Sequence, residues 1–306
     1  MNAAVTEAER PLARFGYRML FACCRHMPYR LGYLLAWMAG WIGWWCDARG
    51  RKQVATNLRP LLEHPAPEAL PRMVRRNYIS FTVTVVEHLR MAWIDPVWLT
   101  APKLQVVDPW GLREQPPTGA AVLTGVHTNW ELYVRWFQLH GFTPRLAGIA
   151  LSHGDAGIDA LFDAVREQLG LTPLRLDRAP LASLRWLREG GQLAIVGDRV
   201  YQGHGIPVRI GYSRLSLPVG PAALAVQSGA PVVVFHLARR GPTELTLFIG
   251  RPLHAQPDLP RDDQVRLLTE EIATWFDRYL RASPHQWAAF MPVWHHDPRC
   301  CPDQDA

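Results

Sequence analysis

Residues 119–150 read GAAVLTGVHTNWELYVRWFQLHGFTPRLAGIA, and the fold class can be argued outward from this stretch. The short apolar run at 119–125 has the length of a buried strand, 131–141 is amphipathic with the length of a helix, and 144–150 is a second apolar run. Two parallel strands need a crossover of about a dozen residues, usually a helix. The stretch therefore predicts a strand–helix–strand unit of a parallel sheet.

The same alternation continues to the end of the chain. We expect further helices at 156–170, 180–189, 218–229 and 261–282, and further strands at 173–176, 193–197, 230–238 and 244–250. Such alternation predicts an α/β fold with a mostly parallel central sheet covered by helices on both faces. The 306 residues suffice for one large domain with a buried core.

The N-terminal part has a different pattern. Residues 11–26 predict a basic amphipathic helix, and residues 31–46, LGYLLAWMAGWIGWWC, carry no charge and contain four Trp. A membrane span needs about 20 apolar residues, so the second run could span a membrane, lie in its headgroup zone or form a buried core helix. We expect a membrane-associated helical segment over residues 1–47, a second helical region at 67–92, and one domain over 48–306.

The net charge of +6 lies entirely in the first hundred residues, where 13 basic residues face 7 acidic ones. This distribution suits an anionic lipid surface or an acidic protein partner. Nucleic acid is not expected as a partner, because no nucleic-acid-binding motif accompanies the charge. The five cysteines show no metal-binding spacing and indicate a reducing compartment. His295, His296, Asp297, Cys300 and Cys301 are interpreted as a terminal tail, so no metal is expected.

Two predicted strands end in charged residues. His127 and Glu131 follow the strand at 119–125, while Asp198 and Arg199 follow the strand at 193–197. In open α/β sheets, functional residues gather at the carboxyl ends of strands. An imidazole can serve as general base toward a hydroxyl, and a carboxylate on its other ring nitrogen fixes the tautomer. Since helical positions four apart share a face, Glu131 is expected to orient His127; a satisfied surface pair is the alternative.

The stretch TG-VHT-NWE (124–131) resembles the signature of the bacterial lipid A biosynthesis acyltransferase family, whose usual form is G-His-Phe-Gly-Asn-Trp-Glu. Four further blocks resemble the family in the right order: RGRKQVATNLRPLLE (49–63), LREGGQLAIVGDR (187–199), LPVGPAALAVQSGAPVVVFHLAR (217–239) and SPHQWAAFMPVW (283–294). The chain departs from the family at the centre of the motif. The family separates its histidine and acidic residue by four residues, whereas three separate His127 from Glu131, and Val126 stands at the histidine position in an ungapped alignment.

The resemblance implies a glycerolipid-acyltransferase-like fold at the cytoplasmic face of the inner membrane. It implies direct acyl transfer from an acyl carrier protein thioester to a hydroxyl of a membrane-anchored glycolipid of the lipid A type, with no dissociable cofactor. His127 would be the general base and Glu131 its orienting residue; the residues expected to bind substrate or stabilise the oxyanion are Asn129, Arg166, Asp198 and Arg199. Two alternatives stay open: a different membrane lipid acceptor, such as a phosphatidylinositol mannoside, or a catalytically inactive homologue that serves as a membrane scaffold.

Overall fold

The computed structural model describes most of the chain. The described residues are 11–63, 66–94, 99, 103–117, 119–140, 145–176, 179–201, 205–241, 244–288 and 290–294. The tail at 295–306, where His295 and Cys300 were weighed as metal ligands, lies outside these residues.

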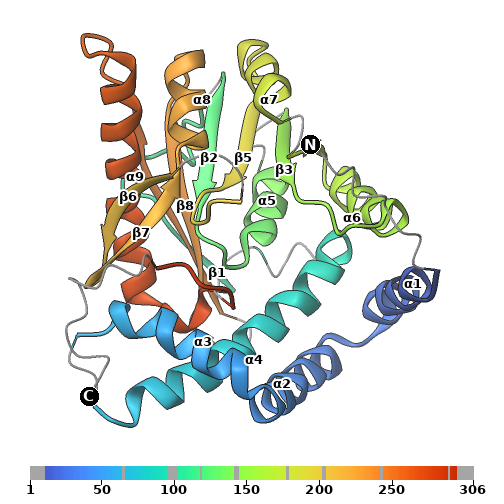
Figure 1. Ribbon diagram of the computed structural model, residues 1–306. Coiled ribbons are helices and arrows are strands. Elements are labelled where there is room, and N and C mark those ends of the chain that lie inside the picture. The colour runs from blue at the N-terminus through green and yellow to red at the C-terminus, as the bar shows by residue number, and fades with distance from the viewer. Residues whose placement is uncertain are drawn as a thin grey trace, which may run out of the picture.

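A seven-stranded sheet forms the centre of the described structure (Figure 1). Its strands lie in the spatial order β1 (Leu104–Val107), β9 (Leu245–Leu253), β8 (Val232–Arg239), β2 (Ala121–Gly125), β5 (Gln192–Val196), β3 (Leu146–Ala150) and β4 (Leu171–Arg175). All neighbouring strands are parallel except β8 and β9. The prediction of a mostly parallel sheet is confirmed.

Helices cover both faces of the sheet. In β2, Val122 packs with the cluster formed by α7 (Ala179–Arg188), α8 (Gly220–Ser228) and α9 (Arg261–Ala282). Its neighbours Ala121 and Leu123 point to the other face and pack against α5 (Trp130–Leu139). Successive side chains of a strand point to opposite sides, so a strand buried on both faces reads as a continuous apolar run. This is the run from which the strand was predicted.

No strand was predicted between the strand at 193–197 and the helix at 218–229, and here the structure adds two. They form a second, two-stranded antiparallel sheet of β6 (Gly205–Ile210) and β7 (Ser213–Pro218). The two-residue turn contains Gly211, whose φ of 57° is accessible to glycine at no steric cost. A Cβ at Gly211 would also lie 2.1 Å from the carbonyl oxygen of Pro60, so the hairpin tip closely approaches the N-terminal helices.

The N-terminal helices gather at one end of the sheet, beneath the carboxyl ends of its five mutually parallel strands, which exclude β1 and β9 (Figure 1). They are α1 (Pro11–His26), α2 (Tyr29–Cys46), α3 (Ala48–Leu58) and α4 (Ala69–Arg90); α6 (Ala156–Gln168) lies beside α1, and short 3-10 turns occupy Arg59–Leu61, Met91–Trp93 and Pro284–Gln286. The predicted boundary falls at Asp47, the one residue between α2 and α3.

The apolar run at 31–46 lies within α2, which packs lengthwise on α4. Its buried positions are Gly32, Ala36 and Gly40, so small residues allow a close approach of the two helices. None of the helices in the described ranges has both the length and the apolar character that crossing a bilayer requires. The opposite face of α2 is exposed, so the interpretation of this run as a fully buried core helix is wrong.

Candidate active site

The ends of β2 and β5 meet at the carboxyl edge of the sheet. The two strands pair in parallel, with Gly125 opposite Val196, so the residues that follow them come together. The backbone N–H of His127 donates a hydrogen bond of 3.0 Å to Oδ2 of Asp198. The two charged strand ends therefore lie side by side; that they form one substrate site stays a prediction.

The turn after β2 presents His127, rather than Val126, to this site. The side chain of Val126 is buried in the hydrophobic cluster that also contains residues of α8 and α9. Within the described structure, Nδ1 of His127 is buried without a hydrogen-bond partner, and the same holds for Oδ1 of Asp198. Burial lowers the pKa of His127 to about 4; the positive charge of Arg199 contributes, and the negative charge of Asp198 opposes the shift. The imidazole is therefore neutral at neutral pH and able to accept a proton.

Glu131 does not orient His127, so that prediction is wrong. Its Oε1 accepts hydrogen bonds from Nη2 and Nε of Arg166, at 3.1 and 3.3 Å, and its Oε2 contacts Nδ1 of His88. The physical reason is where the helix begins. Helix α5 starts at Trp130 with Asn129 as its N-cap, so His127 lies outside the helix and does not share the face of Glu131.

His88 is a site residue that sequence reasoning missed. It comes from α4, and its ring packs against Phe162 of α6 at a centroid distance of 5.2 Å. Burial lowers the pKa of His88 to about 3, with further lowering from Arg166, His153 and His127. The available signal was an ionisable Glu-His pair inside the apolar helical run VTVVEHL (83–89).

Asn129 uses its side-chain amide inside the protein. It donates to Oε2 of the buried Glu87, whose Oε1 accepts from the hydroxyl of Tyr33 at 2.5 Å and from the guanidinium of Arg239. This network joins α2, α4, the start of α5 and β8, and it fixes the turn that carries His127.

The two arginines expected at the site also have internal partners. Arg166 pairs with Asp163 at 3.2 Å in addition to Glu131, and Arg199 donates to the carbonyl of Ala288. Nε of Arg199 lies 3.8 Å from Oδ2 of Asp198, so these two residues form an ion pair at the end of the strand. Contact of Asn129, Arg166, Asp198 or Arg199 with a substrate stays a prediction.

Comparison with known proteins decides which class this geometry belongs to. Residues 10–296 match the family described as bacterial lipid A biosynthesis acyltransferase. The chain belongs to this family of acyltransferases. It is 24% identical over 255 residues to a phosphatidylinositol mannoside acyltransferase of Mycolicibacterium smegmatis, over 81% of each chain. It is 29% identical over 185 residues to enzymes of the same name from two strains of Mycobacterium tuberculosis, over 58% of this chain and 55% of theirs.

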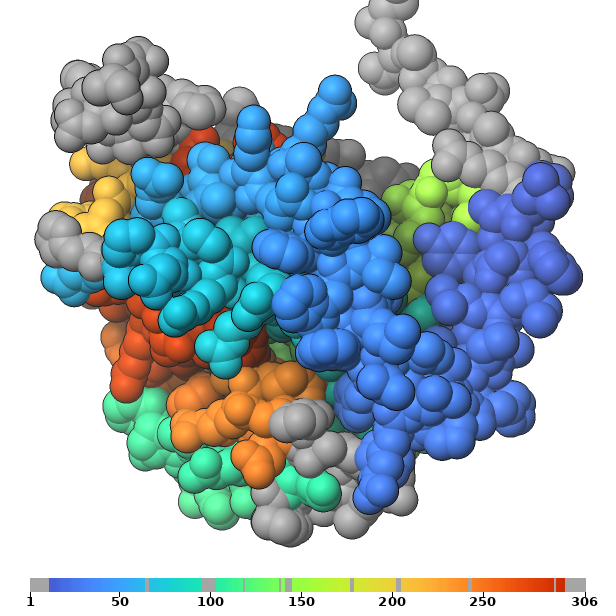
Figure 2. Space-filling view, turned by 90° about the horizontal axis from the view of Figure 1, so that it is seen from below, coloured from blue at the N-terminus to red at the C-terminus, as the bar shows by residue number. Residues whose placement is uncertain are grey.

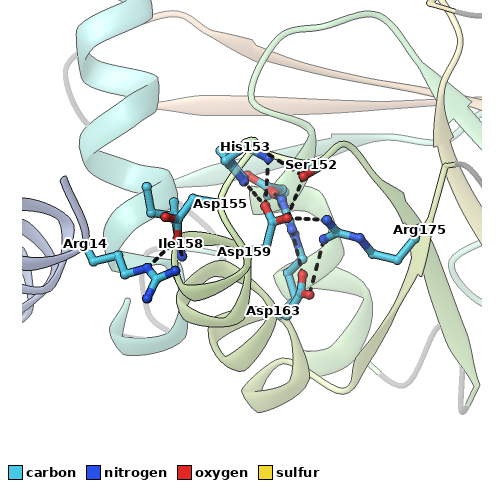
Figure 3. Close-up of polar contacts among 11 residues, drawn as sticks. Arg14, Ser152, His153, Asp155, Ile158, Asp159, Asp163 and Arg175 are labelled. Atoms are coloured by element: carbon cyan, nitrogen blue, oxygen red, sulfur yellow. Dashed lines mark hydrogen bonds and ion pairs between the residues drawn. The ribbon is translucent and has the colours of Figure 1, made fainter. Parts of the chain in front are cut away.

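A second polar network holds α6 of this acyltransferase beside the site (Figure 3). Arg14 of α1 points toward Asp155, with 2.7 Å between Nε and Oδ1, and Asp155 caps α6 by accepting from the backbone N–H of Ile158 at 3.0 Å. One turn further along α6, Asp159 receives hydrogen bonds from the residues around it: Ser152, His153 and Arg175. Although burial opposes the shift, these hydrogen bonds lower the pKa of Asp159 to about 2.

A cavity of about 250 Å³ lies beside the acyltransferase site, between α2, α4 and the start of β9. Its lining is mostly apolar and consists of Tyr29, Tyr33, Val86, Glu87, Arg90, Trp93, Ile94, Leu99, Leu132 and Leu245. Glu87 belongs to the Asn129 network and Leu132 follows Glu131, so the cavity adjoins the site, although His127 does not line it. In the described part of the chain, no three His, Cys, Asp or Glu side chains are grouped to hold a metal ion.

Proposed function

We propose that this acyltransferase moves an acyl chain from an acyl carrier protein thioester to a hydroxyl of a membrane-anchored glycolipid, with His127 as general base. The observation that carries the proposal is the neutral imidazole of His127 beside Asp198 at the carboxyl end of β2. The imidazole takes the hydroxyl proton while the oxygen attacks the thioester carbonyl carbon. Collapse of the tetrahedral intermediate breaks the C–S bond, and the leaving thiolate takes the proton back from the imidazolium.

Asp198 takes the orienting role that the sequence assigned to Glu131. Its Oδ2 accepts a hydrogen bond from the backbone N–H of His127, while its Oδ1 and Nδ1 of His127 are both buried and have no hydrogen-bond partner among the described residues. Buried polar atoms without partners are costly, so the pair has reason to meet once a substrate adjusts the ring. A carboxylate in this position fixes the tautomer in which Nε2 accepts the proton.

The start of α5 and the nearby arginines are proposed to stabilise the oxyanion of the tetrahedral intermediate. The side chain of Asn129 makes no capping bond to α5, so it leaves the first N–H groups of that helix unoccupied by the cap. Such N–H groups, at the positive end of a helix dipole, favour an anion. Arg166 and Arg199 add positive charge beside them and are proposed to hold the acceptor phosphate or the oxyanion.

The membrane surface is proposed to meet the face formed by α1, α2 and part of α4. The exposed apolar side chains on this face are Leu12, Phe15, Met19, Leu20, Tyr29, Leu31, Leu34, Leu35, Trp37, Met38, Ile42, Trp45, Phe81 and Val85. Figure 2 shows the blue and cyan side chains of the N-terminal helices spread over much of this view. An exposed apolar patch of this extent marks an interaction site.

Arginines stack on the aromatic rings of the same helical unit. Arg75 lies 4.7 Å from the ring centre of Trp41, and Arg51 lies 5.6 Å from that of Trp44. Trp with adjacent basic residues is typical of a bilayer interface with anionic lipid. The cavity reaches this face at the half-exposed Tyr29, which supports it as the place for the acyl chain. We therefore propose the cytoplasmic face of the inner membrane as the location.

The acceptor proposed first is a lipid A precursor, as the resemblance implies. The relatives from Mycolicibacterium smegmatis and Mycobacterium tuberculosis are named for a phosphatidylinositol mannoside, which favours that glycolipid as the second candidate. Both acceptors offer sugar hydroxyls on a lipid anchor, so the same base chemistry serves either one.

The test uses purified membranes that contain the protein, to which each combination of acyl donor and acceptor lipid is added. Palmitoyl-acyl carrier protein or palmitoyl-coenzyme A is combined with a lipid A precursor or a phosphatidylinositol mannoside, and acylated lipid is measured by mass spectrometry. We expect product with the carrier-protein donor, loss of at least about 100-fold in His127→Ala, and little change in His140→Ala, whose ring contacts the carbonyl of Trp136 at the far end of α5. Activity that survives His127→Ala would remove His127 from the mechanism. No turnover with any pair of substrates would favour the scaffold interpretation.

A further inference from the structure

The segment around Trp287 folds back across the turn that carries His127. The backbone N–H of Ala288 donates to the carbonyl of His127 at 2.8 Å. The indole Nε1 of Trp287 donates to Oδ2 of Asp198 at 2.6 Å. Two adjacent residues near the C-terminal end of the described chain therefore hold both members of the proposed His127–Asp198 pair.

Trp287 is itself held tightly. Its side chain is fully buried, and its carbonyl accepts a 2.7 Å hydrogen bond from the buried amide of Asn77 in α4. The side chain of the preceding residue, Gln286, makes two hydrogen bonds with the backbone of Arg239. Its Oε1 accepts from the N–H at 2.7 Å, and its Nε2 donates to the carbonyl at 2.8 Å. The indole is fully buried and packs edge-on against Trp294, with 6.0 Å between the ring centroids, so these contacts oppose its rotation away from Asp198.

We propose that Trp287 is a positioning residue for acyl transfer: its indole N–H fixes Oδ2 of Asp198, which leaves Oδ1 for the imidazole of His127. The proposal rests on the function argued above, in which His127 is the base. The backbone N–H of His127 and the indole N–H of Trp287 both donate to Oδ2 of Asp198, and these two hydrogen bonds hold the carboxylate in one orientation. A hydrogen bond to a charged acceptor is roughly twice as strong as one between neutral groups, so the indole is an effective clamp.

The indole also affects the basicity of His127. The charged or titratable groups that act on His127 are Asp198 and Arg199 at the end of β5, and it interacts in turn with His88 of α4. The indole N–H partly neutralises Asp198. Without it, the carboxylate would attract the imidazolium more strongly, and the pKa of His127 would rise.

Trp287→Phe keeps an aromatic ring and removes the N–H. We expect kcat/KM with acyl carrier protein thioester and the glycolipid that the wild type acylates to fall about 10- to 100-fold, through kcat rather than KM. The acid limb of the pH profile should move to higher pH. The matched control is Trp186→Phe, which removes an indole bond of 2.8 Å to the carbonyl of Gln192 at the amino end of β5 and should leave rate and profile unchanged.

A double variant shows whether the indole acts through Asp198. We expect the same rate for Asp198→Asn alone and for the double variant that also carries Trp287→Phe. Additive losses of rate would overturn the proposal. So would a Trp287→Phe variant with unchanged rate and pH profile. Should the Phe variant fail to fold, the indole ¹⁵N–H signals of the tryptophans are compared between the wild type and Asp198→Asn. One indole signal must move in Asp198→Asn. A spectrum without change counts against the proposal. A fully active Trp287→Phe together with an inactive His127→Ala would overturn this inference alone, whereas full activity of His127→Ala would overturn the proposed function.

Discussion

His127 and His88 each lie beside a carboxylate at the carboxyl edge of the sheet. His127 is joined to Asp198 through its backbone, and His88 contacts Glu131 through Nδ1. Burial lowers the pKa of both rings, to about 4 and about 3, so neither carries charge at neutral pH. The site therefore holds two neutral imidazoles, of which His127 is proposed as the base.

The pH dependence of the wild-type enzyme follows from the low pKa of His127. The neutral form that accepts a proton persists down to a pH of about 4 and is lost as the pH falls through that value. We expect kcat/KM to be flat from neutral pH downward and to fall near pH 4, measured over a range in which circular dichroism shows an intact fold. A midpoint near the ordinary histidine value, about 6.5, would contradict the buried imidazole as the base.

Glu131 is predicted to stabilise the folded protein. Glu131→Ala leaves the nearly buried guanidinium of Arg166 with a single carboxylate partner, Asp163, and removes the partner of His88. Breaking a buried pair in this way costs about 3–5 kcal/mol of unfolding free energy. Glu189→Ala is the control, because its pair with Arg145 is about half exposed on both sides and is worth about 0–1 kcal/mol. Denaturant unfolding compares the two; equal losses would contradict the prediction.

At the scale of elements, the contact between α2 and α4 depends on small residues. Gly32, Ala36 and Gly40 form the buried side of α2, and a Cβ at Gly40 would lie 2.6 Å from Cα of Ile79. Across the same interface, Thr82 donates a 2.7 Å hydrogen bond to the carbonyl of Ala36. This close approach places Glu87 and His88 of α4 at the site while α2 presents its other face outward.

Gly40→Ala should therefore destabilise the protein, because backbone atoms of α4 cannot yield as a flexible side chain would. Overpacking of this kind costs about 1–3 kcal/mol. Gly16→Ala is the matched control: a Cβ at Gly16 in α1 meets no atom within 4 Å, and replacing a helical glycine by alanine stabilises by about 0.5–1 kcal/mol. Thermal unfolding followed by circular dichroism should move in opposite directions for the two variants. A stabilising Gly40→Ala would show that the helices are not in close contact.

At the scale of the whole molecule, the N-terminal helices lie across the carboxyl end of the parallel strands (Figure 1) and form much of the surface seen in Figure 2. Large apolar side chains of α1 and α2 are exposed on these helices. The cavity lies between these helices and the sheet, so a lipid that enters from the exposed face reaches the vicinity of Glu87 and Leu132. This arrangement brings a membrane-bound acceptor and the site into one region.

Vesicle flotation tests the membrane face. Ile42→Asp introduces a charge on the exposed apolar side of α2 and should weaken binding to anionic phospholipid vesicles more than about 10-fold, since burial of one large apolar side chain is worth about 1.5–3 kcal/mol. Leu181→Asp changes an even more exposed apolar side chain on α7, away from this face, and should bind as the wild type does. Equal binding by all three proteins would remove the assigned membrane surface.

Periodicity and spacing by themselves determined the α/β class, the strands and helices of the main sheet from residue 119 onward, and the position of His127 and Asp198 after the ends of two strands. These features follow from local apolar patterns and from the rule that parallel strands end at one edge. The hairpin at 205–218 was not predicted, although apolar residues alternate in its strands. It lies outside the main sheet and packs on α9, so it does not follow the strand–helix alternation used for the rest of the chain.

Only the tertiary structure decided which imidazole contacts Glu131. Helix α5 begins after His127, and α4 delivers His88 to Glu131 from 43 positions earlier in the chain. The contact of Trp287 with Asp198, 89 residues apart, was equally hidden. Spacing along a sequence predicts contacts within one element, whereas contacts between distant segments depend on how the whole chain packs, and this site is assembled from such contacts.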